Sequence, residues 1–542
     1  MRLSLTLVVA IAACAPQRAI VAKAPLTMEQ RYDATPKDPL TWAAFDAQTF
    51  ARAKAEGKFV VMDGAAEWCH WCHVMEAVTY HDPKVAELLK AHFIAAKVDI
   101  DARPDIEERY SDYGWPATVI FSPDAAELGK FRGFISPEDF ADILERVVAS
   151  GAQSAIAKAD VVPISDIPLS EEQLAWIKRM TELELEDYWD PELGGWGRQQ
   201  KVAIPTNDAW LISRVRAGDS TAKTRLAVVL DKQRAIMDPV WGGVYQYSTD
   251  GDWAHPHFEK LMYFNAGAID NYAEAFEVTR DAKWLDTARA TRAYVSRFLI
   301  GPDGGFYATQ DADLNAHERG KTFLLGHEYY AKSEAERLAL GVPRIDTHEY
   351  ARENGLAIRA YCTLVRVTQD DTATKEATRA ADRILSTHSD PRGGVTHDAP
   401  GAEVSTKLLH LADNAAFAWG LLGLWDVTHS EARLAQATKI ADFVLASLED
   451  PKGGGFFAHT LDDAAVGIFA ERRKPFEDNV LMLRVLARIA KQSPDKALAY
   501  SRSIARGLRA VATPDAIKER GRFVGDFLLA LDETLGVRTP SK

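Results

Sequence analysis

Two cysteines with two residues between them form the most reactive pair in the chain. Cys69 and Cys72 enclose a histidine and a tryptophan, and a short buried-strand pattern over 59–64 comes just before them. Placed between a strand and a helix, such a pair is typical of a redox-active dithiol. Cys69 would then lie at a helix N-terminus, where partial positive charge stabilises the thiolate that attacks a disulfide. Cys72, one turn further on, would resolve the mixed disulfide.

Strand and helix patterns alternate around this dithiol. The expected strands are 59–64, 93–100 and 115–121, and the expected helices are 74–80, 83–92 and 140–148. This alternation predicts an α/β domain of thioredoxin topology over 39–150. Pro116 lies at the start of the third strand, and we expect it to be the cis-proline that faces the dithiol in this fold.

Two other roles stay open for the cysteine pair. Cys69, Cys72 and His73 carry side chains that bind zinc or copper, and the pair could also be purely structural. A structural zinc site usually has a second Cys or His pair further along the chain, so we favour redox chemistry and expect no resident metal or cofactor. Cys362 lies in a helical stretch over 356–369 and is expected to be an unpaired core cysteine.

A turn with paired glycines recurs five times after residue 168. The turns begin at Gly194, Gly242, Gly304, Gly393 and Gly453, and glycine there permits the positive φ angles that end helices. Apolar residues at helical spacing fill the segments between the turns. The expected helices are 171–188, 208–215, 222–237, 261–279, 283–299, 349–368, 373–387, 409–427, 431–448, 477–490, 495–511 and 523–535.

Twelve helices make six hairpins if the first helix pairs with the last. The pattern therefore predicts an all-α (α/α)6 toroid over 169–542, joined to the first domain by a linker over 151–168. The longest separation, 89 residues between the third and fourth turns, implies an insertion that we place at 312–346.

Such a ring has a pocket at one end, and polar motifs fall in the loops that would line it. Trp253, His257 and Glu259 lie together ahead of one helix, and Asp311 and Asp313 follow the third glycine turn. Paired carboxylates serve as acid and base in glycoside hydrolysis. His257 could act as the base of a sugar epimerisation, and Trp253 could stack on a sugar ring.

Each of these residues also has a structural explanation. Aspartates order turns, tryptophans fill cores, and Glu259 with Lys260 could be a surface ion pair. Two weaker candidates, Glu477-Asp478-Asn479 and Asp413-Asn414, lie at helix starts, where acids are favoured by the helix dipole.

The N-terminus predicts export. A positive start and an apolar run resemble a signal peptide over 1–14, and Ile11-Ala12-Ala13-Cys14 resembles a bacterial lipobox in which Cys14 is lipidated. Plain cleavage with an incidental Cys14 is the alternative. A polar tether over 15–38 follows, and Ala15 favours the outer membrane, so we expect a lipoprotein on the periplasmic side of the cell envelope.

The composition of the chain disfavours some classes of binding partner. The 542 residues carry a formal net charge of −14, which disfavours nucleic-acid binding, and the four cysteines are too few for a disulfide scaffold. No later apolar run reaches the roughly 20 residues of a membrane-spanning helix. The expected partners are protein thiols or disulfides and a glycan, with contact to a membrane only through the N-terminal lipid.

Together these motifs resemble the thioredoxin-domain proteins related to spermatogenesis-associated protein 20, which fuse a thioredoxin-like domain to a six-hairpin glycosidase-like domain. The resemblance extends from about residue 39 to the end. The matching strings are Cys69-His70-Trp71-Cys72-His73, Gly114-Trp115-Pro116-Ala117-Thr118, Pro256-His257-Phe258-Glu259-Lys260 and Gln310-Asp311-Ala312-Asp313.

The chain departs from this family at three places. Trp68 stands where the family has a small or polar residue, Phe264 stands where it has an aspartate, and the family members are mostly not exported. The resemblance implies the architecture and names no reaction.

Three hypotheses follow. The first is an exported thiol–disulfide protein whose helical ring binds a client or glycan, with Cys69 attacking, Cys72 resolving and Pro116 on the substrate side. The second is a carbohydrate-active hydrolase or epimerase that uses His257, Glu259, Asp311 and Asp313. The third is a non-catalytic cell-envelope binding protein.

Overall fold

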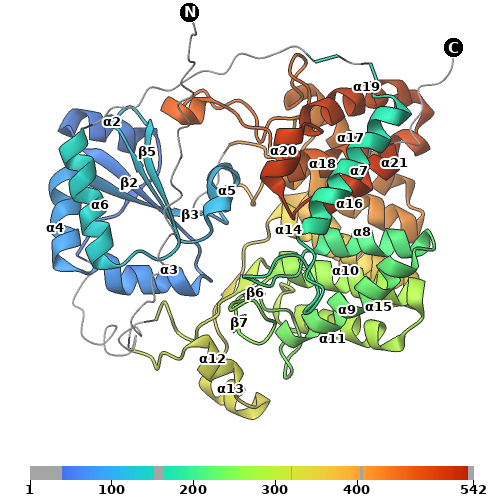
Figure 1. Cartoon of the computed structure of the whole chain (residues 1–542), viewed down its shortest axis with the longest axis horizontal. Helices are drawn as coiled ribbons and strands as arrows, with labels where there is room; N and C mark the ends of the chain where they lie inside the picture. The colour runs from blue at the N-terminus through green and yellow to red at the C-terminus, as the bar shows by residue number, and fades with distance from the viewer. Residues whose placement is uncertain (1–38, 152–163, 166, 319, 403–406, 535–542) are drawn as a thin grey trace, which may run out of the picture.

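The computed structural model describes residues 39–151, 164–165, 167–318, 320–402 and 407–534. The predicted signal peptide, Cys14 and the tether lie outside these residues, as does most of the predicted linker. Figure 1 shows an α/β part beside a larger helical part. Among the described residues, no helix is both long and apolar enough to span a bilayer.

A five-stranded sheet of order β1-β3-β2-β4-β5 forms the α/β part. β2 pairs parallel with β3 and antiparallel with β4, which confirms the predicted thioredoxin topology. β4 begins at Ala117 rather than at the predicted Trp115, because Pro116 has no N–H to give to a strand ladder. The strands are β1 (Ala43–Ala44), β2 (Phe59–Ala65), β3 (Phe93–Asp99), β4 (Ala117–Phe121) and β5 (Glu127–Arg132).

Helices cover both faces of the sheet, and proline with a capping side chain starts two of them. Asp82 caps α4 ahead of Pro83, and Ser136 caps α6 ahead of Pro137. The helices are α2 (Ala47–Glu56), α3 (His70–Met75) continued by η1 (Glu76–Tyr80), α4 (Pro83–His92), α5 (Pro104–Tyr110), η2 (Ser111–Tyr113) and α6 (Pro137–Ser150).

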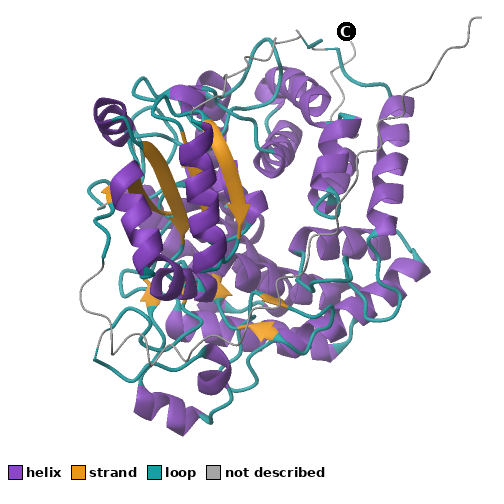
Figure 2. Cartoon of the chain, turned by 60° about the vertical axis from the view of Figure 1, so that its left-hand side comes forward, coloured by secondary structure: helices purple, strands orange, loops and turns teal. Residues whose placement is uncertain are grey.

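The second part is a closed ring of helical hairpins, whose helices are drawn in purple in Figure 2. The inner helices contact one another in the order α8, α10, α14, α16, α18, α21 and back to α8, and each pairs with one outer helix. The inner helices are α8 (Pro205–Arg216), α10 (Met262–Thr279), α14 (Ala351–Thr368), α16 (Leu411–Thr428), α18 (Phe476–Gln492) and α21 (Gly525–Thr534). The outer helices are α7 (Glu171–Asp187), α9 (Ser220–Gln233), α11 (Ala282–Phe298), α15 (Asp371–Thr387), α17 (Glu431–Ser447) and α19 (Pro494–Val511).

These helices correspond to the twelve predicted ones, and α21 packs on α7, so the (α/α)6 toroid closes as expected. The predicted insertion over 312–346 holds two short helices and a strand. The remaining elements are η3 (Arg234–Ile236), β6 (Tyr247–Ser248), β7 (Pro256–His257), β8 (Lys260–Leu261), β9 (Thr309–Gln310), α12 (Gly326–Tyr330), α13 (Glu334–Leu340), β10 (Ile345–Asp346), η4 (Gly467–Ala470) and α20 (Pro514–Arg520).

A buried asparagine near the start of an inner helix holds each of four glycine turns. Asn354 accepts a hydrogen bond from the N–H of Phe306 at 2.8 Å and donates to the carbonyl of the same residue at 3.0 Å. Such a pair satisfies backbone groups that would otherwise be buried without partners. The equivalent acceptors are Asn265, Asn414 and Asn479, which bind the N–H groups of Val244, Val395 and Phe456.

A lysine fixes the aspartate that opens three of the turns. Lys260 Nζ donates to Asp238 Oδ2 at 2.7 Å and to the Gly242 carbonyl at 3.0 Å. Lys201 binds Asp190 in the same way at 2.6 Å, and Lys474 binds Asp450 at 2.7 Å. Lys260 is therefore part of the ring core, not the surface ion pair considered from the sequence.

The ring also packs a segment against the core of the α/β part. Phe469 of η4 contacts Phe45, which follows β1, Phe50 of α2 and Phe121 of β4, with ring centroids 5.4, 6.1 and 5.6 Å away. The N–H of Ile468 donates to the Ala125 carbonyl at 3.1 Å. Because buried aromatic area contributes strongly to interface energy, this contact fixes one part on the other.

Candidate functional site

The dithiol lies where helix α3 begins. Cys69 is its N-cap residue, and the backbone N–H of Cys72 donates to Cys69 Sγ at 3.1 Å. The two sulfurs form a disulfide with Cα atoms 5.2 Å apart, and both cysteines are buried. The Trp115–Pro116 peptide bond is cis, the isomer expected from the sequence. In the reduced form, the same N–H and the helix dipole would stabilise a Cys69 thiolate.

The helical part meets the dithiol through the histidine between the cysteines. His70 Nδ1 lies 2.8 Å from Asp313 Oδ2, and the His70 backbone N–H donates to Glu259 Oε1 at 3.3 Å. Burial opposes protonation of His70, but the hydrogen bond to Asp313 raises its pKa. Two motifs that the sequence assigned to separate sites therefore form one site at the junction of the two parts.

The histidine after the second cysteine reaches the same carboxylates. His73 Nδ1 lies 3.5 Å from Asp313 Oδ2, and its Nε2 lies 3.9 Å from Asp311 Oδ2. Burial would raise the pKa of Asp313, but hydrogen bonds with His70 and His73 hold it well below its usual range. Both aspartates are nearly fully buried, so this charge pairing operates in a medium of low dielectric.

Two cavities open on either side of the Cys-x-x-Cys turn. Cys69 lines one of about 700 Å³, which the helical part encloses on the opposite side with Tyr247, Glu259 and Phe523. His257 and Asp313 line the other, of about 610 Å³. Trp71 lines both. A peptide or glycan segment reaching Cys69 would therefore touch residues of both parts.

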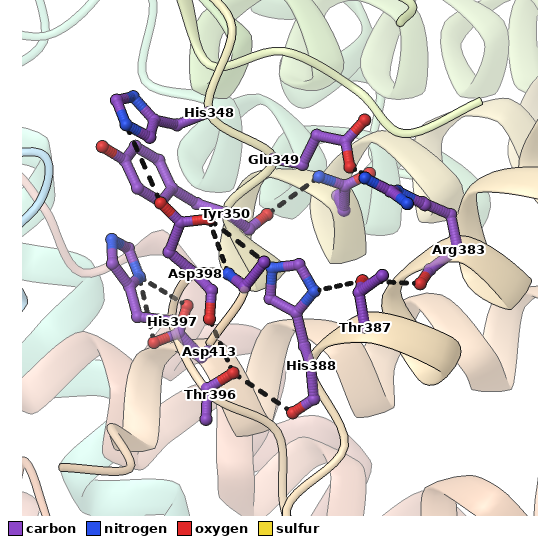
Figure 3. Close-up of polar contacts among 12 residues, drawn as sticks. His348, Glu349, Tyr350, Arg383, Thr387, His388, Thr396, His397, Asp398 and Asp413 are labelled. Carbon is purple, nitrogen blue, oxygen red and sulfur yellow. Dashed lines mark hydrogen bonds and ion pairs between the residues drawn. The ribbon is translucent and has the colours of Figure 1, made fainter. Parts of the chain in front are cut away.

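A third cavity, of about 250 Å³, lies at the mouth of the ring under the α/β part. It is lined by Glu353, Asp413 and His397, among others. Figure 3 shows His397 against Asp413, at 2.9 Å, and Nε2 of the same histidine lies 2.7 Å from the Asp101 carbonyl oxygen of the α/β part. Burial opposes protonation of His397, yet the Asp413 carboxylate raises its pKa to about 9.

The same view shows a polar group next to this cavity. Asp398 has an oxygen 3.8 Å from His348 Nε2 and another 4.0 Å from His388 Nε2. Tyr350 stacks between His348 and His397, with ring centroids 5.3 and 4.1 Å away. The mouth of the ring is thus rich in histidine and carboxylate, although the sequence offered only Asp413 there, as a weaker candidate.

The remaining predicted residues have varied surroundings. Trp253 is buried in the core and donates its indole N–H to the Leu193 carbonyl at 3.0 Å. His257 stacks on Tyr247 with centroids 4.3 Å apart and lies 3.9 Å from Glu259. Asp478 lines a cavity beside α18, and burial raises its pKa to about 7. The alternative metal set is not assembled in this oxidised form, because Cys69 and Cys72 are bonded to each other.

Sequence reasoning missed several groups at these sites. His317, from the insertion, lies 3.3 Å from Asp311 Oδ2. Asp63, on the strand before Cys69, is buried, and this burial raises its pKa to about 6. Glu353 was also missed. Like Asp413, which the sequence offered as a weaker candidate, it comes directly before a turn-holding asparagine, and that spacing was the available signal.

The comparisons with known proteins agree with this architecture. A family model described as Thioredox_DsbH, a protein of unknown function (DUF255), matches residues 29–149. Human spermatogenesis-associated protein 20 is 30% identical over 382 residues, covering 64% of this chain and 47% of that protein. The chain thus spans about half the length of the curated relatives it matches. Thiol:disulfide interchange protein DsbD 1 of Pseudomonas aeruginosa is 33% identical over 122 residues, covering 21% of this chain and 20% of that protein.

The helical part also has a solved counterpart. A sugar epimerase from a ruminal bacterium superimposes with a TM-score of 0.51 and 14% identity, covering 68% of this chain and 100% of that one. At this identity the likeness shows the fold alone. The chain is thus similar to spermatogenesis-associated protein 20 over 64% of its length, and it joins a thioredoxin-like domain to an (α/α)6 domain with the six-hairpin glycosidase-like fold.

Proposed function

We propose that the chain is a thiol–disulfide exchange protein whose helical ring forms one wall of the client site. The observation that carries this proposal is Cys69 at the N-cap of α3, opening onto a cavity of about 700 Å³ that both domains line. Likeness to the interchange protein DsbD 1 supports the same chemistry.

The exchange proceeds in two balanced steps. The Cys69 thiolate attacks one sulfur of a client disulfide, so a Cys69–client bond forms, the client S–S bond breaks, and the released client thiolate takes up a proton. The Cys72 thiolate then attacks Cys69 Sγ, which releases the second client thiolate and leaves the Cys69–Cys72 disulfide. The client gains two electrons that the dithiol loses, and the reverse sequence oxidises a client dithiol.

The aromatic side chains around Cys69 fit an unfolded or extended client. Trp68, Trp71 and Trp115 pack beside the disulfide, and Phe264 and Phe523 line the far wall of the cavity. Such rings offer large apolar contact area with few rotatable bonds. We therefore infer that client peptides bind in the cavity between the domains.

Trapping of the mixed disulfide tests this proposal. Cys72→Ser removes the resolving thiol, so clients should accumulate on Cys69 as adducts that a reductant releases. The matched control is Cys69→Ser/Cys72→Ser, which retains Cys14 and Cys362 and should trap nothing. Equal trapping by both variants, or none by the first, would refute thiol exchange at this site.

A carbohydrate site remains as the second candidate, and the cavity at the ring mouth favours it. Glu353 and Asp413 line that space beside an aromatic ring, Tyr263, and carboxylates with an aromatic face are suited to a sugar. A glycan array with the wild-type chain and Glu353→Gln would test it. Binding or turnover lost in the variant supports the candidate, and unchanged binding excludes this cavity.

We also propose export and lipidation at Cys14, on the signal-like segment that precedes the described residues. Metabolic labelling with palmitate should mark the wild-type chain and not Cys14→Ser. Equal labelling of the two, or none of either, would show that Cys14 is not lipidated.

A further inference from the structure

Three side chains that could bind a metal ion lie close together next to the helix that carries the dithiol. Ligand atoms of His73, Asp311 and His317 all lie within 4.8 Å of one another. His73 comes from the thioredoxin-like domain, and the other two come from the helical domain, Asp311 just before the insertion and His317 within it. None of the functions proposed above uses this convergence.

One oxygen of the carboxylate at this point accepts no hydrogen bond. Asp311 is 2% exposed, and its Oδ1 accepts the N–H of Asp313 at 2.9 Å. Its Oδ2 is buried and has no hydrogen-bond partner, although it lies 3.3 Å from His317 Nε2. Burying a carboxylate oxygen without a partner costs free energy, and a bound cation would remove that cost.

The two imidazoles point at the same place. His73 Nε2 and His317 Nε2 lie 2.9 and 2.7 Å from the single carbonyl oxygen of Glu67. Donors about 2.0–2.2 Å from a tetrahedral zinc ion lie about 3.3 Å from one another. The separations of Asp311 Oδ2 from His317 and His73, 3.3 and 3.9 Å, are close to that spacing.

The surroundings also match those of a metal ligand. A metal-bound histidine usually donates its other ring N–H to a carboxylate, which fixes the ring. His73 has Asp313 Oδ2 at 3.5 Å from its Nδ1, on the opposite side of the ring from Nε2. His317 leaves 29% of its side chain exposed, so an ion can enter from solvent.

We propose that His73, Asp311 and His317 bind a divalent transition-metal ion, with zinc as the best fit to two imidazoles and a carboxylate. The Glu67 carbonyl oxygen lies where a fourth ligand belongs. Because the ligands come from both domains, the ion locks the helix that carries the dithiol onto the ring. The site goes beyond thiol exchange and does not rest on it.

Metal titration of the full chain tests the site. After removal of metal with a chelator, the wild-type chain should bind one zinc ion per molecule at micromolar or lower free zinc, and zinc should raise its melting temperature. His317→Ala should weaken binding by about 100-fold and abolish the shift. The matched control is His255→Ala, an exposed histidine beside Asp252, which should bind zinc as the wild type does.

Two further measurements distinguish zinc binding at this site from zinc binding by Cys69 and Cys72. Cys69→Ser/Cys72→Ser should keep the zinc affinity, and cobalt bound in place of zinc should show no thiolate charge-transfer band. Zinc binding that is lost in the serine variant, a thiolate band, or no stoichiometric binding by the wild type would each overturn the proposal. Because His317 is exposed, His317→Ala should have the same melting temperature as the wild type when both are measured in the presence of chelator. Lost zinc binding would then not reflect misfolding.

Discussion

Replacing Lys260 by methionine should destabilise the helical domain far more than replacing Lys474. Both lysines bind the aspartate of a glycine turn at 2.7 Å. The side chain of Lys260 is 0% exposed, whereas that of Lys474 is 26% exposed. The two substitutions therefore remove the same kind of lysine–aspartate ion pair, once from a fully buried position and once from a partly exposed one.

The size of the effect follows from what each lysine leaves behind. Without Lys260, Asp238 stays buried with Arg337 as its remaining charged partner, also at 2.7 Å. Breaking a buried ion pair costs about 3–5 kcal/mol. Because Arg337 remains, we expect the low end, about 3 kcal/mol. For the more accessible Lys474, water can solvate the aspartate, and the expected cost is about 1 kcal/mol.

Methionine is suited to this comparison because it keeps most of the side-chain volume. Three tyrosine rings surround Lys260 Nζ, and their centroids lie 4.3, 5.0 and 5.3 Å away. A methionine can pack against these rings, so the experiment isolates the loss of the charge together with its hydrogen bonds to Asp238 and Gly242.

Urea unfolding followed by far-ultraviolet circular dichroism, which the helical domain dominates, gives the free energy of unfolding. Equal destabilisation by the two variants would refute the account of Lys260 as a buried turn lock. So would a negligible effect of Lys260→Met.

Three further changes test other parts of the account. Glu259→Gln removes a carboxylate from the N–H of His70, next to Cys69, so the thiolate form gains stability and the dithiol potential should rise by about 30 mV; a fall would contradict this electrostatic role. Asn354→Ala leaves the Phe306 N–H and carbonyl without partners and should lower the free energy of unfolding by about 2–3 kcal/mol, whereas a neutral result would show that the turn does not need this asparagine. Burial raises the pKa of Asp208 from 3.8 to about 7, above its unfolded value, so its ionisation costs stability progressively between pH 4 and pH 7 and fully above pH 7. Asp208→Asn should therefore stabilise the chain by at most about 4 kcal/mol at pH 8 and by much less at pH 5; a gain independent of pH would exclude the carboxylate as its cause.

The helical ring could be predicted from the sequence because its signals are local. Apolar residues at helical spacing and the glycine turns gave twelve helices whose ends mostly agree with the structure to within two or three residues. Five elements of the thioredoxin-like domain were not predicted: β1, α2, α5, η2 and β5. β1 and β5 lie at the two edges of the sheet, where a weaker apolar pattern suffices, and α5 and η2 are short.

The junction of the two domains could not be predicted in this way. His70 and Asp313 are 243 residues apart in the chain, and His70 and Glu259 are 189 apart. No local pattern encodes such pairing, so the motifs were assigned to two sites. Likewise, Asp311 and His317 were not connected with His73, because only the docking of the helical domain on the thioredoxin-like domain brings them together.

The reduction potential of the Cys69–Cys72 pair tests the central claim most directly. Glutathione titration of the full chain carrying Cys14→Ser would leave the pair and the buried Cys362 as the only cysteines. The account predicts a reversible two-electron transition between about −270 and −120 mV, the range of thioredoxin-like dithiols. A pair that stays oxidised or reduced across that range would contradict thiol–disulfide exchange at the junction of the two domains.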